Sequence, residues 1–479
     1  AADEEDLIPI VEYYWKLGFN DPDIAAHSLD HFERGLFGLR FSHSAKSIQR
    51  LRTKLGLQGT RQQAVTAGTI TPFYLEIRER YPQMGARTMV ATLRQDYSIK
   101  VAESFLNKFL KSVEPDAVKQ RRVFRFKRKK YWCAGIMDIV CFDQHDKWKK
   151  FGLYKHIGVE PYAGQILWLK IWWTNRNPKL VTSYYLEACR RAGGIPLITQ
   201  SDLGTENYGI ANCHTATRQR LDPSLVGTLQ HRWMKKMGIN IKPEAAWSQM
   251  RRQFSPGFEN ILDDGVARGL YNVDNPVEKL VFLWLAIPWL QAELDAWVHR
   301  YNSTPRRRDK NKVLPQGIPD LITAKPHLYG AEDYKAEVLV PPELFNEMEA
   351  QWAPPTDPVF DLAPPVFTTK IVAIYESLGS PAVSSTNFWE VYSQLLNSII
   401  PIQEELSAAI HEQDNAFDAP IELLPEQAEL RQGANAVAGF EYYGGVPDFA
   451  PDAPESGDEN GDDEEDHRDF ADLTDIESS

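Results

Sequence analysis

The pattern of apolar residues changes at Tyr131, and this change constrains the fold more than any other feature of the chain. Before it, apolar residues recur at helical spacing; after it, they form short runs rich in β-branched and aromatic residues, as strands do. The expected elements are strands at 136–142, 152–159 and 165–173, a helix at 177–191 and a strand at 195–198. Three strands, a helix and another strand predict a mixed α/β sheet.

Two aspartates are expected at the ends of these strands. Asp143 follows the first apolar run, and Asp202 opens the loop after the last run, which turns at Gly204. Sites on such sheets usually lie at strand ends, where a rigid backbone presents side chains to a crevice. An aspartate two residues before a glycine is also a common turn. The interpretation of Asp202 therefore depends on partners elsewhere in the chain.

A third carboxylate comes from a helix expected to begin near Pro243, since proline is favoured at the first helical position. Helical spacing places Glu244, Trp247, Ser248 and Arg251 on one face of that helix. Phosphoryl transfer on nucleic acid commonly uses two divalent metals, and hard cations prefer carboxylate oxygens. Together with the two aspartates, Glu244 would complete a three-carboxylate metal site.

Several motifs carry a resemblance to a known family. They are Asp202 to Asn207 (DLGTEN), Glu244 to Arg252 (EAAWSQMRR), 166–169 (ILWL), Asn177-Pro178 followed by 184–186 (YYL), and the regions 135–152, 291–295 and 315–319. Together they resemble the integrase core of the retroviral-integrase and DDE-transposase superfamily, an RNase H-like fold, and in particular the integrase-like proteins of fungal genomes. The resemblance covers about residues 70 to 322.

The resemblance implies that Asp143, Asp202 and Glu244 are the catalytic residues and the ligands of Mg²⁺ or Mn²⁺ in DNA cleavage and strand transfer. Asp138 is the rival for the first position, but it falls inside the strand, out of register with the family motif. Glu259 is the rival for the third position and lacks the neighbouring Trp, Ser and Arg.

The chain departs from the family pattern around these carboxylates. Gln144 and His145 stand where the family has Gly and Tyr, Glu160 lies in a turn that has lost its Asp and Arg, and Ala246 replaces one Trp of a pair. The alternative is therefore a domesticated, catalytically inactive nuclear DNA-binding or scaffold protein with the same fold. A generic RNase H-like nuclease shares the carboxylates but does not explain the N-terminal helices described next.

The N-terminal region is expected to bind DNA through helix-turn-helix units. The first unit has predicted helices at 7–17, 21–32 and 45–55. Its third helix carries Lys46, Gln49 and Arg50, as in a helix-turn-helix reader, although a plain helical bundle fits the same pattern. A second unit at 71–111, opened by Pro72, resembles the helix-turn-helix that precedes many transposase and integrase cores.

A dense basic segment follows these units. Residues 119–130 contain eight cations in twelve positions, as expected of a linker that follows a phosphate backbone, or of a solvated linker or nuclear-import signal. The predicted DNA-contacting cations of this segment are Arg121, Arg122, Arg125, Lys127, Arg128, Lys129 and Lys130. Lys147, Arg251 and Arg252, near the carboxylates, are expected to face DNA phosphates, with solvated surface as the alternative.

The C-terminal tail is strongly acidic. From Asp452 onward there are thirteen acidic residues and one basic residue, Arg468, so the tail carries −12 of the net −13 and leaves about −1 for the rest. Its composition predicts disorder. Such a tail would mimic nucleic acid and shield basic surfaces, or contact a basic, histone-like partner.

Other features indicate an intracellular protein, expected in the nucleus. The four cysteines have no CxxC pair or zinc spacing, which favours reduced thiols. The longest apolar run, 280–290, is too short to span a membrane. Residues 1–6 are acidic, so no signal peptide is expected.

Six regions are predicted, and a homo-oligomer on DNA is a further expectation. They are a helix-turn-helix-like domain (1–65), a second such unit (66–117), a basic linker (118–130), an integrase catalytic core with an RNase H-like fold (131–322), a partly helical region (323–443) and a disordered acidic tail (444–479).

Overall fold

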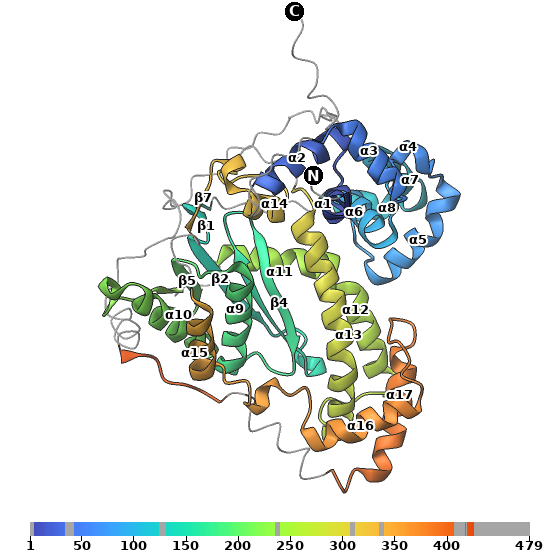
Figure 1. The fold of residues 1–479 in the computed structure, drawn as a ribbon. Helices are drawn as coiled ribbons and strands as arrows, with labels where there is room; N and C mark the ends of the chain where they lie inside the picture. Colours follow the sequence, from blue (N-terminus) through green and yellow to red (C-terminus); the bar gives the residue numbers. More distant parts are fainter. Residues whose placement is uncertain are drawn as a thin grey trace, which may run out of the picture.

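A computed structural model describes most of the chain. The described residues are 4–33, 43–123, 131–234, 240–306, 312–334, 340–406, 417 and 419–425, with backbone alone at 4–6, 29–33, 120, 122 and 123. Figure 1 shows N-terminal helices at one corner, a central sheet flanked by helices, and C-terminal helices along the opposite side.

The three helices expected in the first unit are present. It consists of α1 (Glu4–Leu17), α2 (Asp21–Glu33) and α3 (Ala45–Lys54). Gly18, at φ 100°, ends α1, and the Ser44 side chain caps α3 by accepting a hydrogen bond from the Ser47 amide. The unit has its own hydrophobic cluster, which includes Ile318 and Leu321 at the start of α14 (Pro319–Ala324).

The second helical unit is also present, with one corrected boundary. It contains α4 (Thr60–Gln63), α5 (Ala67–Arg80), α6 (Ala86–Tyr97), α7 (Glu103–Val113) and α8 (Pro115–Val123). The prediction that Pro72 opens a helix is wrong, because Thr66 and Thr69 form a capping box and Pro72 lies inside α5. Helix α8 also occupies the first part of the segment expected to be a linker.

The core is a mixed sheet, consistent with an RNase H-like fold. Its five strands are β2 (Ile139–His145), β3 (Tyr154–Glu160), β4 (Gln165–Trp172), β5 (Ile198–Asp202) and β6 (His231–Met234). The spatial order is β4-β3-β2-β5-β6; β3 is antiparallel to β2 and β4, and β5 is parallel to β2 and β6. A separate pair joins β1 (Gly135–Ile136) to β7 (Glu332–Asp333).

Two strand boundaries differ from the prediction. The strand expected at 136–142 is interrupted at Met137, at φ 57°. Strand β2 begins after this break and continues to His145, so Asp143 lies within β2 and not after it. The strand expected at 195–198 lies at 198–202, so Asp202 is its last residue. In both cases backbone pairing with a neighbouring strand extends the strand through polar residues, and periodicity along one segment does not report that pairing.

Helices cover the sheet. They are α9 (Pro178–Ala192), α10 (Tyr208–Leu221), α11 (Ile241–Gln253), α12 (Ser255–Ala267) and α13 (Pro276–Ser303). Helix α11 contacts β2 and β3, α9 contacts β4, and α10 contacts β5 and β6. Helix α11, which carries Glu244, therefore lies beside β2, which carries Asp143.

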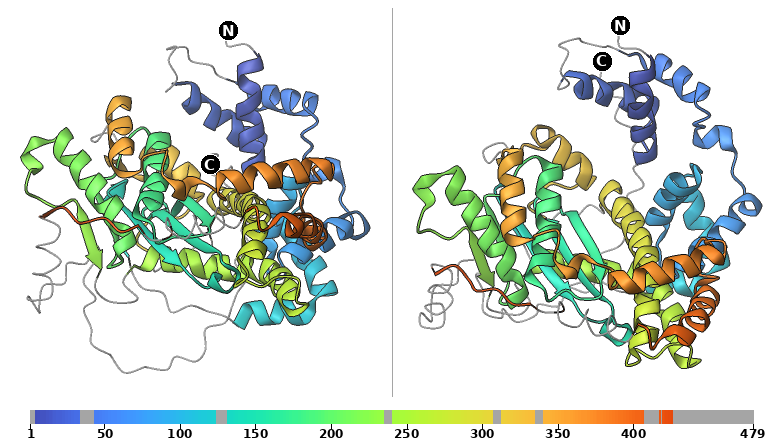
Figure 2. Two further views of the ribbon diagram at one scale, coloured as in Figure 1. Left: turned by 90° about the horizontal axis from the view of Figure 1, so that it is seen from below. Right: turned by 60° about the horizontal axis from the view of Figure 1, so that its bottom comes forward.

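The C-terminal region packs on the core. It contains α15 (Pro342–Trp352), α16 (Pro365–Ser377) and α17 (Phe388–Ile399), consistent with a partly helical region. The indoles of Trp172 and Trp173 on the core donate to the carbonyls of Val359 and Asp361, each at 2.9 Å. Figure 2 shows the orange C-terminal helices lying against the yellow-green helices, and α17 contacts α13.

Two general expectations concern membranes and cysteines. No helix in the described part of the chain is long and apolar enough to cross a membrane. All four cysteines are buried free thiols.

Candidate metal centre and DNA-facing surfaces

Asp143 and Asp202 lie on neighbouring parallel strands. Cys141 of β2 pairs with Gln200 of β5, and the same register two residues further places Asp143 opposite Asp202. Neighbouring strands are about 4.8 Å apart, and residues in register point to the same face. The sheet therefore brings two carboxylates from distant parts of the sequence to one place.

The pKa values of both groups reflect this proximity. Burial, followed by the charges of Asp202 and Glu244, raises the pKa of Asp143 to about 7. Burial and then the charge of Glu244 raise the pKa of Asp202 to about 6. All three predicted carboxylates thus lie close enough to repel one another when ionised.

Helix α11 is fixed against β2 beside these groups. At its start, the side-chain amide of Asn240 donates to the carbonyl of Phe142 at 2.8 Å. One turn after Glu244, the indole of Trp247 donates to Oδ2 of Asp143 at 3.0 Å. The same indole lies against the ring of His145, with 4.8 Å between centroids. These contacts hold the backbone of Glu244 near the two aspartates.

Asp143, Asp202 and Glu244 have the chemistry to bind a divalent cation, but their side chains are not gathered around a cation site. Three carboxylates are the donor set that Mg²⁺ and Mn²⁺ prefer, and Oδ1 of Asp202 is buried without a hydrogen-bond partner. Yet among the described residues no group of three or more His, Cys, Asp or Glu side chains is gathered to hold an ion.

The rival carboxylates have structural partners. Oδ2 of Asp138 accepts a hydrogen bond from the Ala134 amide at 2.8 Å, in the break between β1 and β2. Oε1 of Glu259 accepts from the indole of Trp148 at 2.5 Å. These two hydrogen bonds give Asp138 and Glu259 a role in stabilising the fold.

Gln144 ties β2 to the loop after β5. Its side-chain amide donates to Oε1 of Glu206 and to Oδ1 of Asn207, the latter at 3.3 Å. Asn207 in turn donates to the Asp202 carbonyl at 3.1 Å. The residue that replaces the family glycine therefore holds the motif loop in place.

Sequence reasoning missed two buried groups beside the site. Lys155 of β3, in register with His145, is fully buried, and its amine lies 3.4 Å from the centre of the Trp148 ring. Burial lowers the pKa of Lys155 well below its usual value. Burial, then the charges of Lys155, Lys147 and Arg251, lowers the pKa of His145 to about 3. The available signal was a lysine next to a histidine within a predicted strand.

The predicted DNA-facing residues lie in different environments. Lys46, Gln49 and Arg50 on α3 are exposed, as are Lys147 and Arg251. Arg252 is partly buried, and burial lowers its pKa. Arg121 forms an ion pair with Glu114 at 2.5 Å, which gives it a structural partner. The Arg122 side chain lies outside the described residues, as do Arg125, Lys127, Arg128, Lys129 and Lys130.

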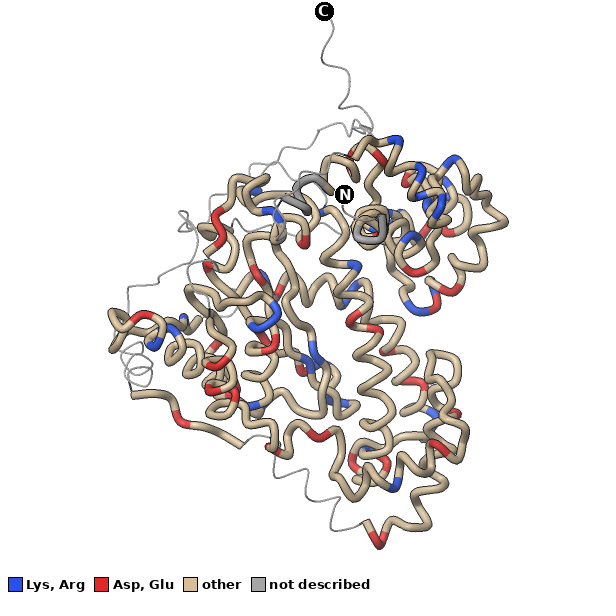
Figure 3. The backbone as a smooth tube through the Cα atoms, viewed as in Figure 1, with Lys and Arg blue, Asp and Glu red and all other residues tan. Residues whose placement is uncertain are grey.

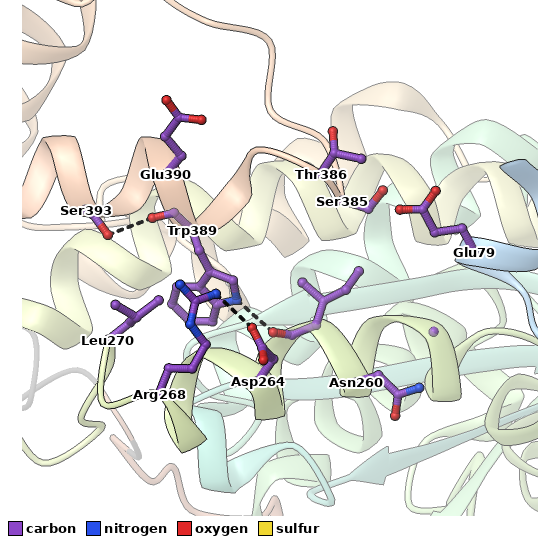
Figure 4. A pocket seen from close by; sticks show the side chains of 12 residues that line it. Glu79, Asn260, Asp264, Arg268, Leu270, Ser385, Thr386, Trp389, Glu390 and Ser393 are labelled. Atoms are coloured by element: carbon purple, nitrogen blue, oxygen red, sulfur yellow. Dashed lines mark hydrogen bonds and ion pairs between the residues drawn. The ribbon is translucent and has the colours of Figure 1, made fainter.

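Two concavities lie away from the three carboxylates. One, of about 550 Å³, is lined by residues of both α12 and α17. Figure 4 shows the Trp389 indole and the Arg268–Asp264 ion pair on its wall, with Glu79 opposite. Another of about 430 Å³ is lined by three lysines, Lys149, Lys150 and Lys279. Neither includes Asp143, Asp202 or Glu244 in its lining.

Comparison with known proteins supports the family of the core. Residues 135–318 match the family model of the integrase core domain, which supports the retroviral-integrase, RNase H-like superfamily. All three predicted carboxylates fall within the matched range. Proteins with this domain are polynucleotidyl transferases and generally use divalent metals and bind DNA. No curated protein matches the chain.

Proposed function

We propose that the chain is a transposon-derived DDE recombinase of the integrase type, which cleaves DNA and transfers strands with a divalent metal. The observation that carries this proposal is the register of β2 and β5, which sets Asp143 opposite Asp202 within the range that matches the integrase core. The raised pKa values of the two aspartates support it, since mutual repulsion is relieved by a bound cation.

In this proposal Asp143, Asp202 and Glu244 hold Mg²⁺ or Mn²⁺. When bound, the metal activates water or a DNA 3′-hydroxyl as the nucleophile and stabilises the leaving oxygen. Trp247 orients Asp143 through its indole hydrogen bond. The exposed cations Lys147 and Arg251 bind the flanking phosphates.

The remaining regions serve DNA binding. The N-terminal units and the basic segment at 118–130 bind DNA in the nucleus, where the chain acts as a homo-oligomer. The acidic tail, which lies outside the described residues, shields these basic surfaces or contacts a basic, histone-like partner.

The direct test is nicking and strand transfer on duplex DNA with Mg²⁺ or Mn²⁺. Asp202→Asn and Glu244→Gln are expected to lower the rate by at least about 100-fold, a loss of about 2.7 kcal/mol of transition-state stabilisation. Asp138→Asn is the matched control, because its amide oxygen still accepts from Ala134 and its activity should equal that of the wild type. Equal activity of the wild type and Asp202→Asn would contradict the proposal.

Metal binding has a separate readout. Thermal unfolding of the wild type should shift upward with Mg²⁺, by about 1.4 kcal/mol of stability at ten times the Kd. The shift should vanish in Asp202→Asn and persist in Asp138→Asn.

A second candidate is the catalytically inactive nuclear DNA-binding or scaffold protein. It is favoured by the absence, within the described residues, of a side-chain group gathered for a metal, and by Gln144, whose amide binds the motif loop. This protein would bind DNA but show neither cleavage nor a metal-dependent thermal shift.

A further inference from the structure

Two N-terminal helices present exposed faces of the same layout. On α3 the residues are Lys46, Gln49, Arg50 and Thr53; on α7 they are Ser104, Asn107, Lys108 and Lys111. Each set follows the spacing i, i+3, i+4 and i+7, which places its members in one row along a helix. All eight residues are exposed.

The α7 face is polar and cationic. Leu106, Phe109 and Leu110 anchor the opposite side of α7 in the core. Lys108 and Lys111 form no ion pair with another described side chain. Asn107 lies next to Lys108 in the row and offers an amide, the group that pairs with adenine in the major groove.

Three polar side chains of helix α6, by contrast, are engaged with other parts of the protein: Arg94, Gln95 and Asp96. The Gln95 amide donates to the hydroxyl of Ser303 at 2.6 Å, and Asp96 forms an ion pair with Arg300 at 3.0 Å. Arg94 is 8 % exposed and faces the first unit. Of α6 and the helix that follows it, α7, the latter is therefore the one whose row of polar residues is exposed.

Buried and partly buried hydrogen bonds join the two units. Arg94 donates to the carbonyls of Lys16 at 2.7 Å and Leu17 at 3.2 Å, at the end of α1. The amine of Lys100, just before α7, donates to the carbonyl of Phe19 at 3.0 Å. Gly18 permits this approach, because a Cβ there would lie 2.7 Å from the Arg94 guanidinium. These hydrogen bonds hold together the two units that carry the exposed faces.

We propose that α3 and α7 together read one bipartite duplex DNA site with fixed spacing between its halves. An α-helix with side chains is about 10–12 Å wide and fits the major groove of about 12 Å. Gln49 and Asn107 supply amides for base edges, and the neighbouring cations bind guanine or phosphate. The proposal rests on the DNA binding proposed above and is independent of the catalytic carboxylates.

The test is selection from a random-sequence duplex pool by the full chain carrying Asp202→Asn, with EDTA to prevent cleavage. Two conserved blocks at one spacing are expected. Asn107→Ala with Lys108→Ala should erase one block, and Gln49→Ala with Arg50→Ala the other, each lowering affinity for the selected duplex by about tenfold. Arg87→Ala, exposed on α6, is the matched control and should leave both blocks intact.

The junction between the units has its own variants. Arg94→Met and, as a milder change, Lys100→Met should broaden the spacing between the blocks while leaving each block readable. Far-ultraviolet circular dichroism checks that each variant is folded. If Arg94→Met is unfolded, the Lys100→Met result decides the test.

Four results would overturn the proposal. The first is a single selected block that the α7 variant does not change, and the second is variable spacing between the blocks when both units and their junction are unmutated. The other two are binding of two duplexes per chain and binding that selects no sequence. Loss of cleavage with both blocks retained would instead contradict only the catalytic function.

Discussion

Glu160 shows how strongly a single side chain depends on its surroundings. It is fully buried, and its two carboxylate oxygens accept hydrogen bonds from the amides of Tyr162 at 3.0 Å and Ala163 at 2.8 Å. Burial nevertheless dominates and raises the pKa of Glu160 from 4.5 to about 7. A residue that looks like a simple departure from the family turn is therefore a buried acid that titrates near neutrality.

This shift predicts how stability depends on pH. Because the folded-state pKa is raised, the folded protein retains a proton that the unfolded chain releases, so Glu160 lowers stability as pH rises from about 4.5 to about 7. Glu160→Gln should remove that slope, so its stability relative to the wild type should rise by at most about 3 kcal/mol between pH 4.5 and pH 8. Its amide nitrogen cannot accept one of the two backbone hydrogen bonds, which lowers its stability equally at both pH values. Urea unfolding at the two pH values measures this; parallel pH profiles for the two proteins would refute it.

At the scale of elements, one glycine sets the contact between the second helical unit and the core. A Cβ at Gly257 on α12 would lie 2.0 Å from the carbonyl oxygen of Arg80, at the end of α5. That neighbour is backbone, so it cannot rotate away as a side chain does. The two helices approach closely because residue 257 has no side chain.

Gly257→Ala is accordingly expected to destabilise the fold by about 1–3 kcal/mol, because α5 and α12 must separate. Gly68→Ala is a matched control within α5, where the nearest atom to an added Cβ is Oγ1 of Thr66 at 3.9 Å. It should stabilise by up to about 1 kcal/mol, since alanine is the better helix former. Thermal unfolding measures both, and equal effects would show that the helix contact is not tight.

At the scale of the whole molecule, charge is segregated along the chain. The acidic tail carries −12 of the net −13, and the eight cations of residues 119–130 are the densest basic segment. Figure 3 shows Lys and Arg positions recurring on the N-terminal helices, mixed with acidic ones. The strongest positive charge therefore falls, in sequence, between the N-terminal helices and the range that matches the integrase core domain.

Neutralising Lys127, Arg128, Lys129 and Lys130 together is expected to weaken DNA binding more at low salt than at high salt. The slope of log K against log salt should fall by about 3–4, because four phosphate contacts are lost at about 0.9 each. Arg268→Ala with Lys370→Ala is the control, since these exposed cations already pair with Asp264 and Glu405. Fluorescence anisotropy across a salt series measures the slope, and an unchanged slope would refute the role of the segment.

The sequence by itself determined the elements whose signals are local. The helices expected at 45–55 and 177–191 were found within a few residues. Their ends, at Ser44, Asn177 and Gly193, depend on capping by neighbouring residues. The motif around Asp202 and the helix bearing Glu244 were likewise visible from spacing and from family resemblance, in agreement with the matched range 135–318.

Tertiary structure alone decided how these parts meet. The register that sets Asp143 opposite Asp202, the burial of Lys155 and Glu160, the engagement of Arg94 with the carbonyls of α1 and the packing of the C-terminal helices on the core all join residues far apart in sequence. Strand pairing and burial depend on which distant segment lies alongside, and periodicity within one segment carries no record of that neighbour.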